Sequence, residues 1–200
     1  MSTIKGSELL FEKLCDRKGI KWRRIKEDSE YGKKPDYLIL IKGQLIVVEI
    51  KQFDPSERDK KIWDNFRKGI IEFFAIKTKY EIADKIRSGK KQLKPFSVRP
   101  TLLILMDNTG GISSLEGSHL YEAMHGFNGI LSSNRTTYLS AIGRLKFLLL
   151  EEKGELDIFY NSNTTNSLDP SILKSLARKQ YKVDENTPDN FTARWLEIEV

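Results

Sequence analysis

The sequence lacks most of the residues on which disulfide-bonded, zinc-binding and membrane proteins depend. Cys15 is the single cysteine among 200 residues, so no internal disulfide forms and a reducing compartment is favoured. Cys15 itself reads as a small buried residue of the first helix. The two histidines, His119 and His125, are six residues apart, which does not stack them as a zinc-ligand pair on one helix, and we expect surface or capping positions for them.

Several other signatures are also missing. No run of about twenty apolar residues occurs, so we expect no membrane-spanning helix. The first residues lack the long apolar stretch of a secretory signal, and a cytoplasmic protein is expected. The glycines of residues 107–111 lack the lysine of a phosphate-binding loop, and residues 112–118 lack the glycine-serine elbow of a hydrolase.

What the sequence does contain is enough apolar residues for a core and an excess of positive charge. Hydrophobic residues make up 39% of the chain and charged residues 31%, with a net charge of +6. We predict one domain over residues 1–200, whose core lies at about residues 1–110. Basic residues cluster at residues 21–26, at Lys33 and Lys34, and at residues 85–94, which is compatible with a surface that binds phosphates.

The first half of the chain alternates between helical and strand patterns. Apolar spacing predicts a helix over residues 6–18, then a weaker strand over 20–25 and a strand pair within 32–53. Residues 54–93 read as a long helical stretch that breaks near 77–79. Asp54 or Ser56 caps this stretch, which carries an apolar stripe. The stripe comprises Ile62, Phe66, Ile70, Phe73 and Phe74, and it continues with Tyr80, Ala83 and Ile86.

The second half continues the mixture of strands and helices. We expect a buried strand at residues 101–107, a short helix at 117–126 and a hairpin over 147–161 that turns at Lys153-Gly154. Asp169 as N-cap and Pro170 at the first position predict a helix over 169–180, and residues 191–200 read as a closing strand. The chain is therefore expected to be an α/β or α+β protein whose central strands are covered on both faces.

Acidic and basic residues at the ends of the strand pair raise the question of function. If Lys42-Gly43 is a two-residue turn, Asp36 lies opposite Glu49, and Lys51 projects from the same face. A two-residue turn one step later would place Asp36 opposite Lys51. A three-residue loop would turn Asp36 away unless a bulge corrected it.

Two carboxylates that face each other across a strand pair repel, unless a cation lies between them. Carboxylate oxygens suit Mg²⁺ or Mn²⁺, which need few protein ligands and keep several waters. A lysine beside such an ion stabilises the negative charge that a phosphodiester gains during attack, and metal-bound water loses a proton more easily. The pattern therefore predicts a divalent-metal site, whose chemistry would suit attack on a phosphodiester.

Pro35-Asp36, the hairpin, and then Glu49-Ile50-Lys51 resemble the motif of the PD-(D/E)xK nuclease superfamily. The resemblance implies a restriction-endonuclease-like α/β fold, in which helices flank a mixed β-sheet, and a Mg²⁺-dependent endonuclease. By this resemblance Asp36 and Glu49 bind the metal, the main-chain carbonyl of Ile50 adds a ligand, and Lys51 orients or activates the water.

The resemblance also implies further residues. An acid from the first helix often joins such a site, and Glu8 matches by position, with Glu12 one turn on as the alternative. Some branches add a glutamine or lysine from a following helix, for which Gln92 is the nearest candidate. The glutamine-tyrosine helix signature of the RecB-like branch is not evident. We expect nucleic acid, most simply DNA, to contact Lys33, Lys34, Lys90, Lys91 and Gln92.

Two functions remain open at this point. The first is a nuclease; because cutting both DNA strands with one site per chain commonly takes two chains, a homodimer is one expected assembly. The second is a catalytically inactive module on the same fold that binds nucleic acid or a protein. The intact set of Asp36, Glu49 and Lys51 favours the first, since a binding module has no need of it.

Overall fold

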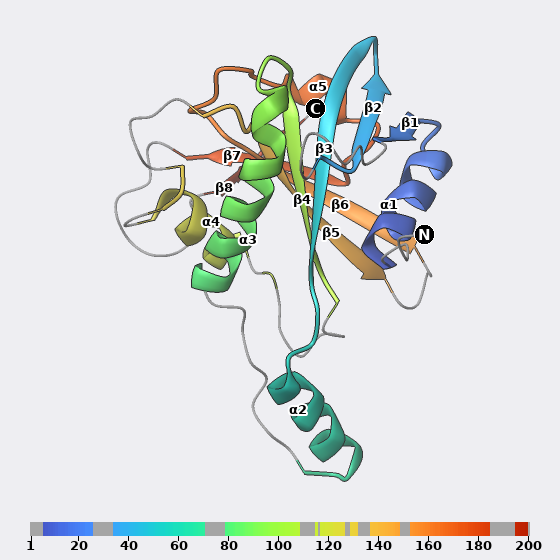
Figure 1. Cartoon of the computed structure of the whole chain (residues 1–200), viewed down its shortest axis with the longest axis vertical. Helices are drawn as coiled ribbons and strands as arrows, with labels where there is room; N and C mark the ends of the chain where they lie inside the picture. The colour runs from blue at the N-terminus through green and yellow to red at the C-terminus, as the bar shows by residue number, and fades with distance from the viewer. Residues whose placement is uncertain are drawn as a thin grey trace.

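The structure is a computed structural model that describes residues 6–25, 34–70, 79–108, 115, 117–126, 129–131, 137–148, 153–184 and 195–199. Within these residues, eight strands form one mixed sheet in sequential order, β1 to β8 (Figure 1). The strands are β1 (Lys21–Arg24), β2 (Tyr37–Ile41), β3 (Gln44–Phe53), β4 (Thr101–Asp107), β5 (Ala141–Leu148), β6 (Lys153–Tyr160), β7 (Lys179–Val183) and β8 (Trp195–Glu197).

The sheet combines antiparallel and parallel neighbours. β1, β2 and β3 form an antiparallel meander, and β4 and β5 then run parallel to β3. β6 is antiparallel to β5, β7 is parallel to β6, and β8 is antiparallel to β7. Parallel neighbours need a long crossover, and the crossover from β3 to β4 contains two helices.

Helices cover both faces of this sheet. They are α1 (Gly6–Arg17), α2 (Glu57–Arg67), α3 (Lys79–Leu93), the 3-10 turn η2 (Lys94–Phe96), α4 (Gly117–His125) and α5 (Pro170–Leu173). Apolar residues of α1 and α5 pack against one face, and those of α3 and α4 pack against the other. The prediction of an α/β sheet covered on both faces is therefore confirmed.

Strand β3 shows how the alternation of side chains divides the two faces. Ile46, Val48 and Ile50 point into the cluster under α1, whereas Val47 points into the cluster under α3. Because strand side chains alternate, Glu49 and Lys51 share the α3 face with Val47. The candidate charged residues therefore lie on the α3 face of the sheet.

The predicted two-residue turn is confirmed. Ile41 pairs with Gln44, and Lys42 and Gly43 between them have φ values of 48° and 80°. Positive φ at both central residues is the backbone of a type I′ hairpin turn. The three-residue loop and the later turn are thereby excluded.

The long helical stretch divides into α2 and α3, as predicted, but α2 already ends at Arg67. Ser56, rather than Asp54, caps α2, and it exchanges hydrogen bonds with Asp59 in a capping box. The predicted apolar stripe is only partly buried: Ile62 is buried, whereas Phe66 is 52% exposed.

Farther along the stripe, Ile70 is 51% exposed and Tyr80 is also exposed, whereas Ala83 and Ile86 on α3 are buried. Phe73 and Phe74 lie outside the described residues. Figure 1 shows α2 projecting beyond the end of β3, away from the sheet. A helical apolar pattern predicts an amphipathic helix but cannot say whether the sheet extends far enough to cover its apolar face.

The hairpin over residues 147–161 is present, but the prediction that it turns at Lys153-Gly154 is wrong. Leu148 pairs with Lys153 and Phe147 with Gly154, so both turn residues belong to β6. Glycine at position 154 is required by packing and not by a turn. A Cβ there would lie 2.9 Å from Cγ of Leu10, so the missing side chain lets α1 approach β6.

The predicted helix over residues 169–180 is also wrong in extent. Asp169 does cap a helix, accepting a hydrogen bond from the Ser171 amide, but α5 ends at Leu173. β7 begins at Lys179 and pairs with β6, and the buried Gln180 side chain accepts a hydrogen bond from Tyr160. Sheet pairing and this buried contact override local helix propensity.

Three other predicted elements are confirmed: the helix at 117–126, the buried strand at 101–107 and the closing strand. Cys15 is fully buried and its thiol pKa is raised, which agrees with an inert core residue. His119 and His125 are half-buried, and His125 is the last residue of α4, where its Nε2 atom is buried. None of the helices in the described ranges has the length and apolarity to cross a membrane.

Candidate metal centre

The hairpin of β2 and β3 brings the two predicted carboxylates together. Tyr37 pairs with Val48, so the preceding Asp36 stands opposite Glu49. Directly opposite residues of an antiparallel pair point to one face, with Cβ atoms about 5 Å apart. The negative charge of Asp36 raises the pKa of Glu49, which agrees with this proximity.

Pro35 precedes the paired residues of β2. If the register continued past the pair of Tyr37 and Val48, Pro35 would stand opposite Ile50. The Ile50 amide points toward β2, where it donates to Oδ2 of Asp36 at 2.7 Å. Because the N–H and C=O of one strand residue point to the same neighbour, the Ile50 carbonyl also faces this edge. Proline has no N–H to donate to it, which leaves the carbonyl oxygen for another partner.

Glu49 is in an environment that a lone carboxylate does not favour. Its side chain is 1% exposed, and its Oε2 atom is buried without a hydrogen-bond partner. Burial, first, and then the charge of Asp36 raise the pKa of Glu49 to about 8, although Lys51 acts in the opposite direction. The carboxyl is thus a buried oxygen donor that faces a second acid and has the Lys51 ammonium group at its other oxygen.

Lys51 lies beside Glu49 and is held by a third residue. Its Nζ is 2.6 Å from Oε1 of Glu49, and it also donates to Oε1 of Gln92 on α3. The Gln92 amide in turn donates to the main-chain carbonyl of Lys34 at 3.2 Å. Gln92 therefore ties the lysine to the segment that leads into β2, and it limits the positions that the ammonium group can take.

The donor set fits a small hard cation of the Mg²⁺ type. Two carboxylates lie at the edge where β2 begins, the Ile50 carbonyl is a possible third oxygen ligand, and water would fill the remaining positions around such an ion. Among the described residues, no three side chains from histidine, cysteine, aspartate and glutamate gather into a metal-binding group.

Glu8 lies 3.4 Å from Arg24, on the α1 face of the sheet. Glu12, the alternative, is bound more tightly in the same place: it lies 2.5 Å from Arg24 Nη2 and accepts from Tyr37 Oη at 2.8 Å. The helix acids thus stabilise the packing of α1 on β1 and β2, on the face away from Asp36 and Glu49.

The predicted nucleic-acid contacts are distributed unequally around the cluster. Lys34 is half-buried next to the site, and Lys33 lies outside the described residues. Lys91 is exposed on the outer side of α3, whereas Lys90 is half-buried and burial lowers its pKa. Residues two apart on a helix point about 200° apart, so Lys90 faces away from the side of α3 that carries Gln92.

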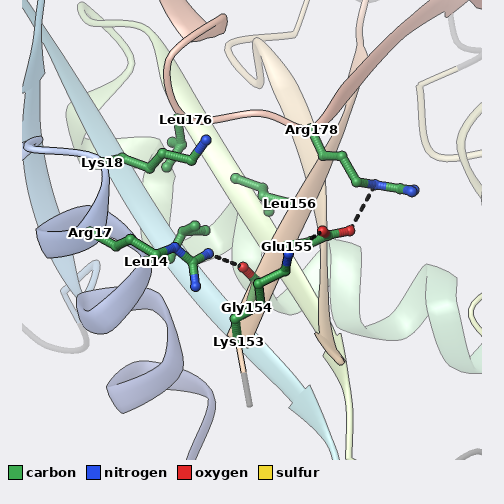
Figure 2. Close-up of a pocket in the computed structure, with 9 residues that line it drawn as sticks. All are labelled: Leu14, Arg17, Lys18, Lys153, Gly154, Glu155, Leu156, Leu176 and Arg178. Atoms are coloured by element: carbon green, nitrogen blue, oxygen red, sulfur yellow. Dashed lines mark hydrogen bonds and ion pairs between the residues drawn. The ribbon is translucent and has the colours of Figure 1, made fainter. Parts of the chain in front are cut away.

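A pocket lies on the opposite face, between α1, β6 and the segment after α5 (Figure 2). Its volume is about 240 Å³, with Leu14 and Leu156 among its lining residues. Two of its arginines already have partners: Arg17 donates to the Gly154 carbonyl, and Arg178 pairs with acids of β6. The pocket is therefore separate from the carboxylate pair.

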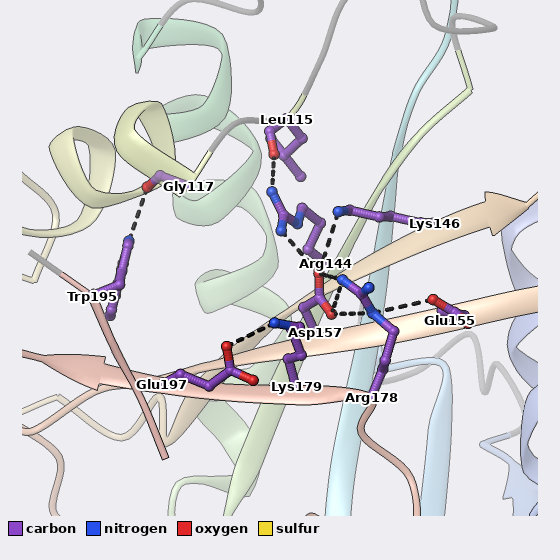
Figure 3. Close-up of polar contacts among 10 residues, drawn as sticks. All are labelled: Leu115, Gly117, Arg144, Lys146, Glu155, Asp157, Arg178, Lys179, Trp195 and Glu197. Carbon is purple, nitrogen blue, oxygen red and sulfur yellow. Dashed lines mark hydrogen bonds and ion pairs between the residues drawn. The ribbon is translucent and has the colours of Figure 1, made fainter. Parts of the chain in front are cut away.

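Sequence reasoning missed a second charged cluster, around Asp157 (Figure 3). Asp157 is 1% exposed and accepts hydrogen bonds from Arg144 at 2.9 Å and from Arg178 at 3.0 Å. Burial alone would raise the pKa of Asp157, but Arg144, Lys146 and Arg178 lower it. The alternating pattern of "GELDIFY" predicts the strand. The basic partners of Asp157, however, come from β5 and from Arg178, the residue before β7. This cluster stabilises the sheet and offers no unpaired ligand oxygen.

Comparison with known proteins adds no independent assignment to this geometry. No family model, no curated protein and no solved structure matches the chain.

Proposed function

We propose that the protein is a Mg²⁺-dependent nuclease of the PD-(D/E)xK type that hydrolyses phosphodiester bonds in DNA. The single observation that carries the proposal is the buried Glu49 carboxyl, which faces Asp36 across the strand pair and lies 2.6 Å from the ammonium group of Lys51. Two acids in this arrangement repel each other, and a divalent cation between them would offset that repulsion.

The order of elements supports the same proposal. One helix, a three-stranded meander, a helical crossover of α2 and α3, and a parallel fourth strand follow one another, and a restriction-endonuclease-like core would have this order of helix, strands, helical segment and strand. The carboxylates lie where the meander ends, and Lys51 follows on the same strand face. Mn²⁺ is expected to substitute for Mg²⁺, because it takes the same oxygen ligands.

Each residue has a distinct proposed role. Asp36 and Glu49, with the Ile50 carbonyl, would hold the ion, which supplies an acidified water and charge neutralisation at the phosphate. Lys51 would orient the attacking water and stabilise the charge that develops on the phosphoryl oxygens. Gln92 would act as a positioning residue, since it contacts Lys51 and the main chain of Lys34.

The test is nicking of supercoiled plasmid DNA by the purified chain, with Mg²⁺, with Mn²⁺ and with EDTA. Asp36→Asn, Glu49→Gln and Lys51→Met should each lower the rate by about a hundredfold or more. Glu8→Gln is the matched control, since this acid pairs with Arg24, and it should retain cleavage. Circular dichroism and thermal unfolding check that each variant is folded.

Two results would contradict the proposal in different ways. Cleavage that survives all three substitutions would mean that the site is elsewhere. Absence of nicking with either metal, together with retention of DNA in a gel shift, would favour the alternative function, a catalytically inactive module that binds nucleic acid.

A further inference from the structure

We propose that an open part of the sheet next to the candidate site binds the sugar-phosphate backbone of DNA on one side of the bond to be cut. We call this surface the β1–β2 shelf and define it by Lys21, Arg23, Leu38 and Leu40. The inference rests on the proposed function for its position relative to cleavage, but its binding chemistry is tested separately.

The pairing register places the shelf on the site face. Arg23 pairs with Leu38, and Lys21 pairs with Leu40. Leu38 packs against the core cluster under α3, so its partner Arg23 points to the same face. Arg24, the next residue, points to the other face and is taken up by the acids of α1. Only alternate cations of β1 are therefore turned toward the site.

The two shelf cations are available for a ligand. Lys21 and Arg23 are exposed, and neither forms an ion pair with any described residue. Within residues 21–25 and 34–41, the part of these two strands and their flanks that the structure describes, Asp36 is the single acidic residue. Two exposed positive charges on one face, without an ion-pair partner among the described residues, favour an anionic partner.

The leucines of the shelf are uncovered because α3 packs farther along the sheet. Apolar residues of α3 lie against Val47 of β3 and Leu103 of β4. Leu40 is 40% exposed, and Leu38 and Leu45 are half-buried. The sheet therefore presents partly exposed leucines beside the two cations of its outer strand.

The dimensions fit one strand of DNA. Arg23 is one strand across and two positions along from Asp36, which corresponds to about 8 Å between Cα atoms, and Lys21 is about 14 Å away. One strand of B-DNA carries a phosphate every 3.4 Å along the axis, so the shelf spans about four nucleotides. Lys21 and Arg23 would contact phosphates within this distance of the scissile bond.

The experiment measures DNA binding in EDTA, where no cleavage occurs, by anisotropy of a short fluorescent duplex over a range of salt concentrations. The variant Lys21→Gln/Arg23→Gln removes both shelf charges. The control Lys174→Gln/Lys182→Gln removes two other exposed cations: Lys182 alternates with Tyr181, which packs on the α3 face, so it points to the opposite face. Each lost phosphate contact should reduce the slope of log K against log salt by about 0.9.

We expect the shelf variant to reduce this slope by about two and the control to leave it unchanged. Equal slopes for the two variants, or no binding by the unmodified chain, would overturn the inference. Plasmid nicking separates the two proposals. A shelf variant with raised KM and unchanged kcat supports both proposals. If the shelf variant reduces the salt slope as expected but the unmodified chain does not nick DNA, the shelf is supported and the nuclease is refuted. Nicking with unchanged KM in the shelf variant refutes the shelf alone.

Discussion

Replacement of Glu49 by glutamine tests the physical basis of the site without any substrate. The pKa of Glu49 is raised from 4.5 to about 8 in the folded chain, because the carboxyl is buried and Asp36 is nearby. A carboxyl with a raised folded-state pKa favours folding when protonated. That contribution is complete below the unfolded pKa and is lost as the pH rises through the folded pKa. The metal-free protein should therefore lose stability across this window.

The size of the loss follows from the same two values. Each unit of pKa difference corresponds to about 1.4 kcal/mol, and solvent screening is small because Glu49 is 1% exposed. Between about pH 5 and pH 8 the free energy of unfolding should fall by about 3 kcal/mol through this group alone. Glutamine keeps the shape of the side chain and does not titrate, so Glu49→Gln should remove this part of the pH dependence.

Urea unfolding in EDTA at several pH values gives both free energies directly. The unmodified chain should become less stable relative to Glu49→Gln as the pH rises. Addition of Mg²⁺ at the upper end should restore stability to the unmodified chain, by about 2.7 kcal/mol at a hundred times its dissociation constant. Parallel pH profiles for the two proteins would refute the account of a strained carboxyl pair.

Other predictions concern the rest of the fold. Asp157→Asn should lower the free energy of unfolding by about 3–5 kcal/mol, because Arg144 is left as a buried cation without its carboxylate; chemical denaturation measures this, and Glu197→Gln, in an exposed pair, should change it by less than about 1 kcal/mol. His125 has its pKa lowered to about 4 by burial, so its contribution to stability is complete above the unfolded pKa of 6.5 and is lost as the pH falls toward 4. His125→Gln should remove up to about 3 kcal/mol of that loss, and an unchanged acid profile would contradict the burial argument.

The hairpin and its charged residues were predictable because they depend on local chemistry. A Lys-Gly pair between apolar runs specifies a two-residue turn, the turn specifies the register, and the register places Asp36 opposite Glu49. Each step involves residues fewer than twenty apart in sequence. The same locality explains why the capping of α2 by Ser56 could also be read from the sequence.

The incorrect predictions concern residues whose structure depends on contacts with a distant part of the chain. Gly154 reads as a turn residue, yet its lack of a side chain accommodates Leu10 on α1. Residues 174–180 have a helical sequence pattern, yet the segment from Lys179 forms a strand because it pairs with β6. Local propensity is a weak determinant in such places, because burial and pairing contribute more energy than propensity differences of less than 1 kcal/mol per residue.

The placement of Glu8 and Gln92 shows the same division within the site. Both are separated from the hairpin by many residues, and both were considered as partners of the carboxylates. The side on which a helix packs decides the outcome: α1 covers the face of Ile50, whereas α3 covers the face of Glu49 and Lys51. Gln92 thus reaches Lys51, and Glu8 instead pairs with Arg24. Sequence spacing gives the direction of a side chain on its own helix but not the face of the sheet on which that helix packs, so the third component of such a site has to be identified from the packing of the helices.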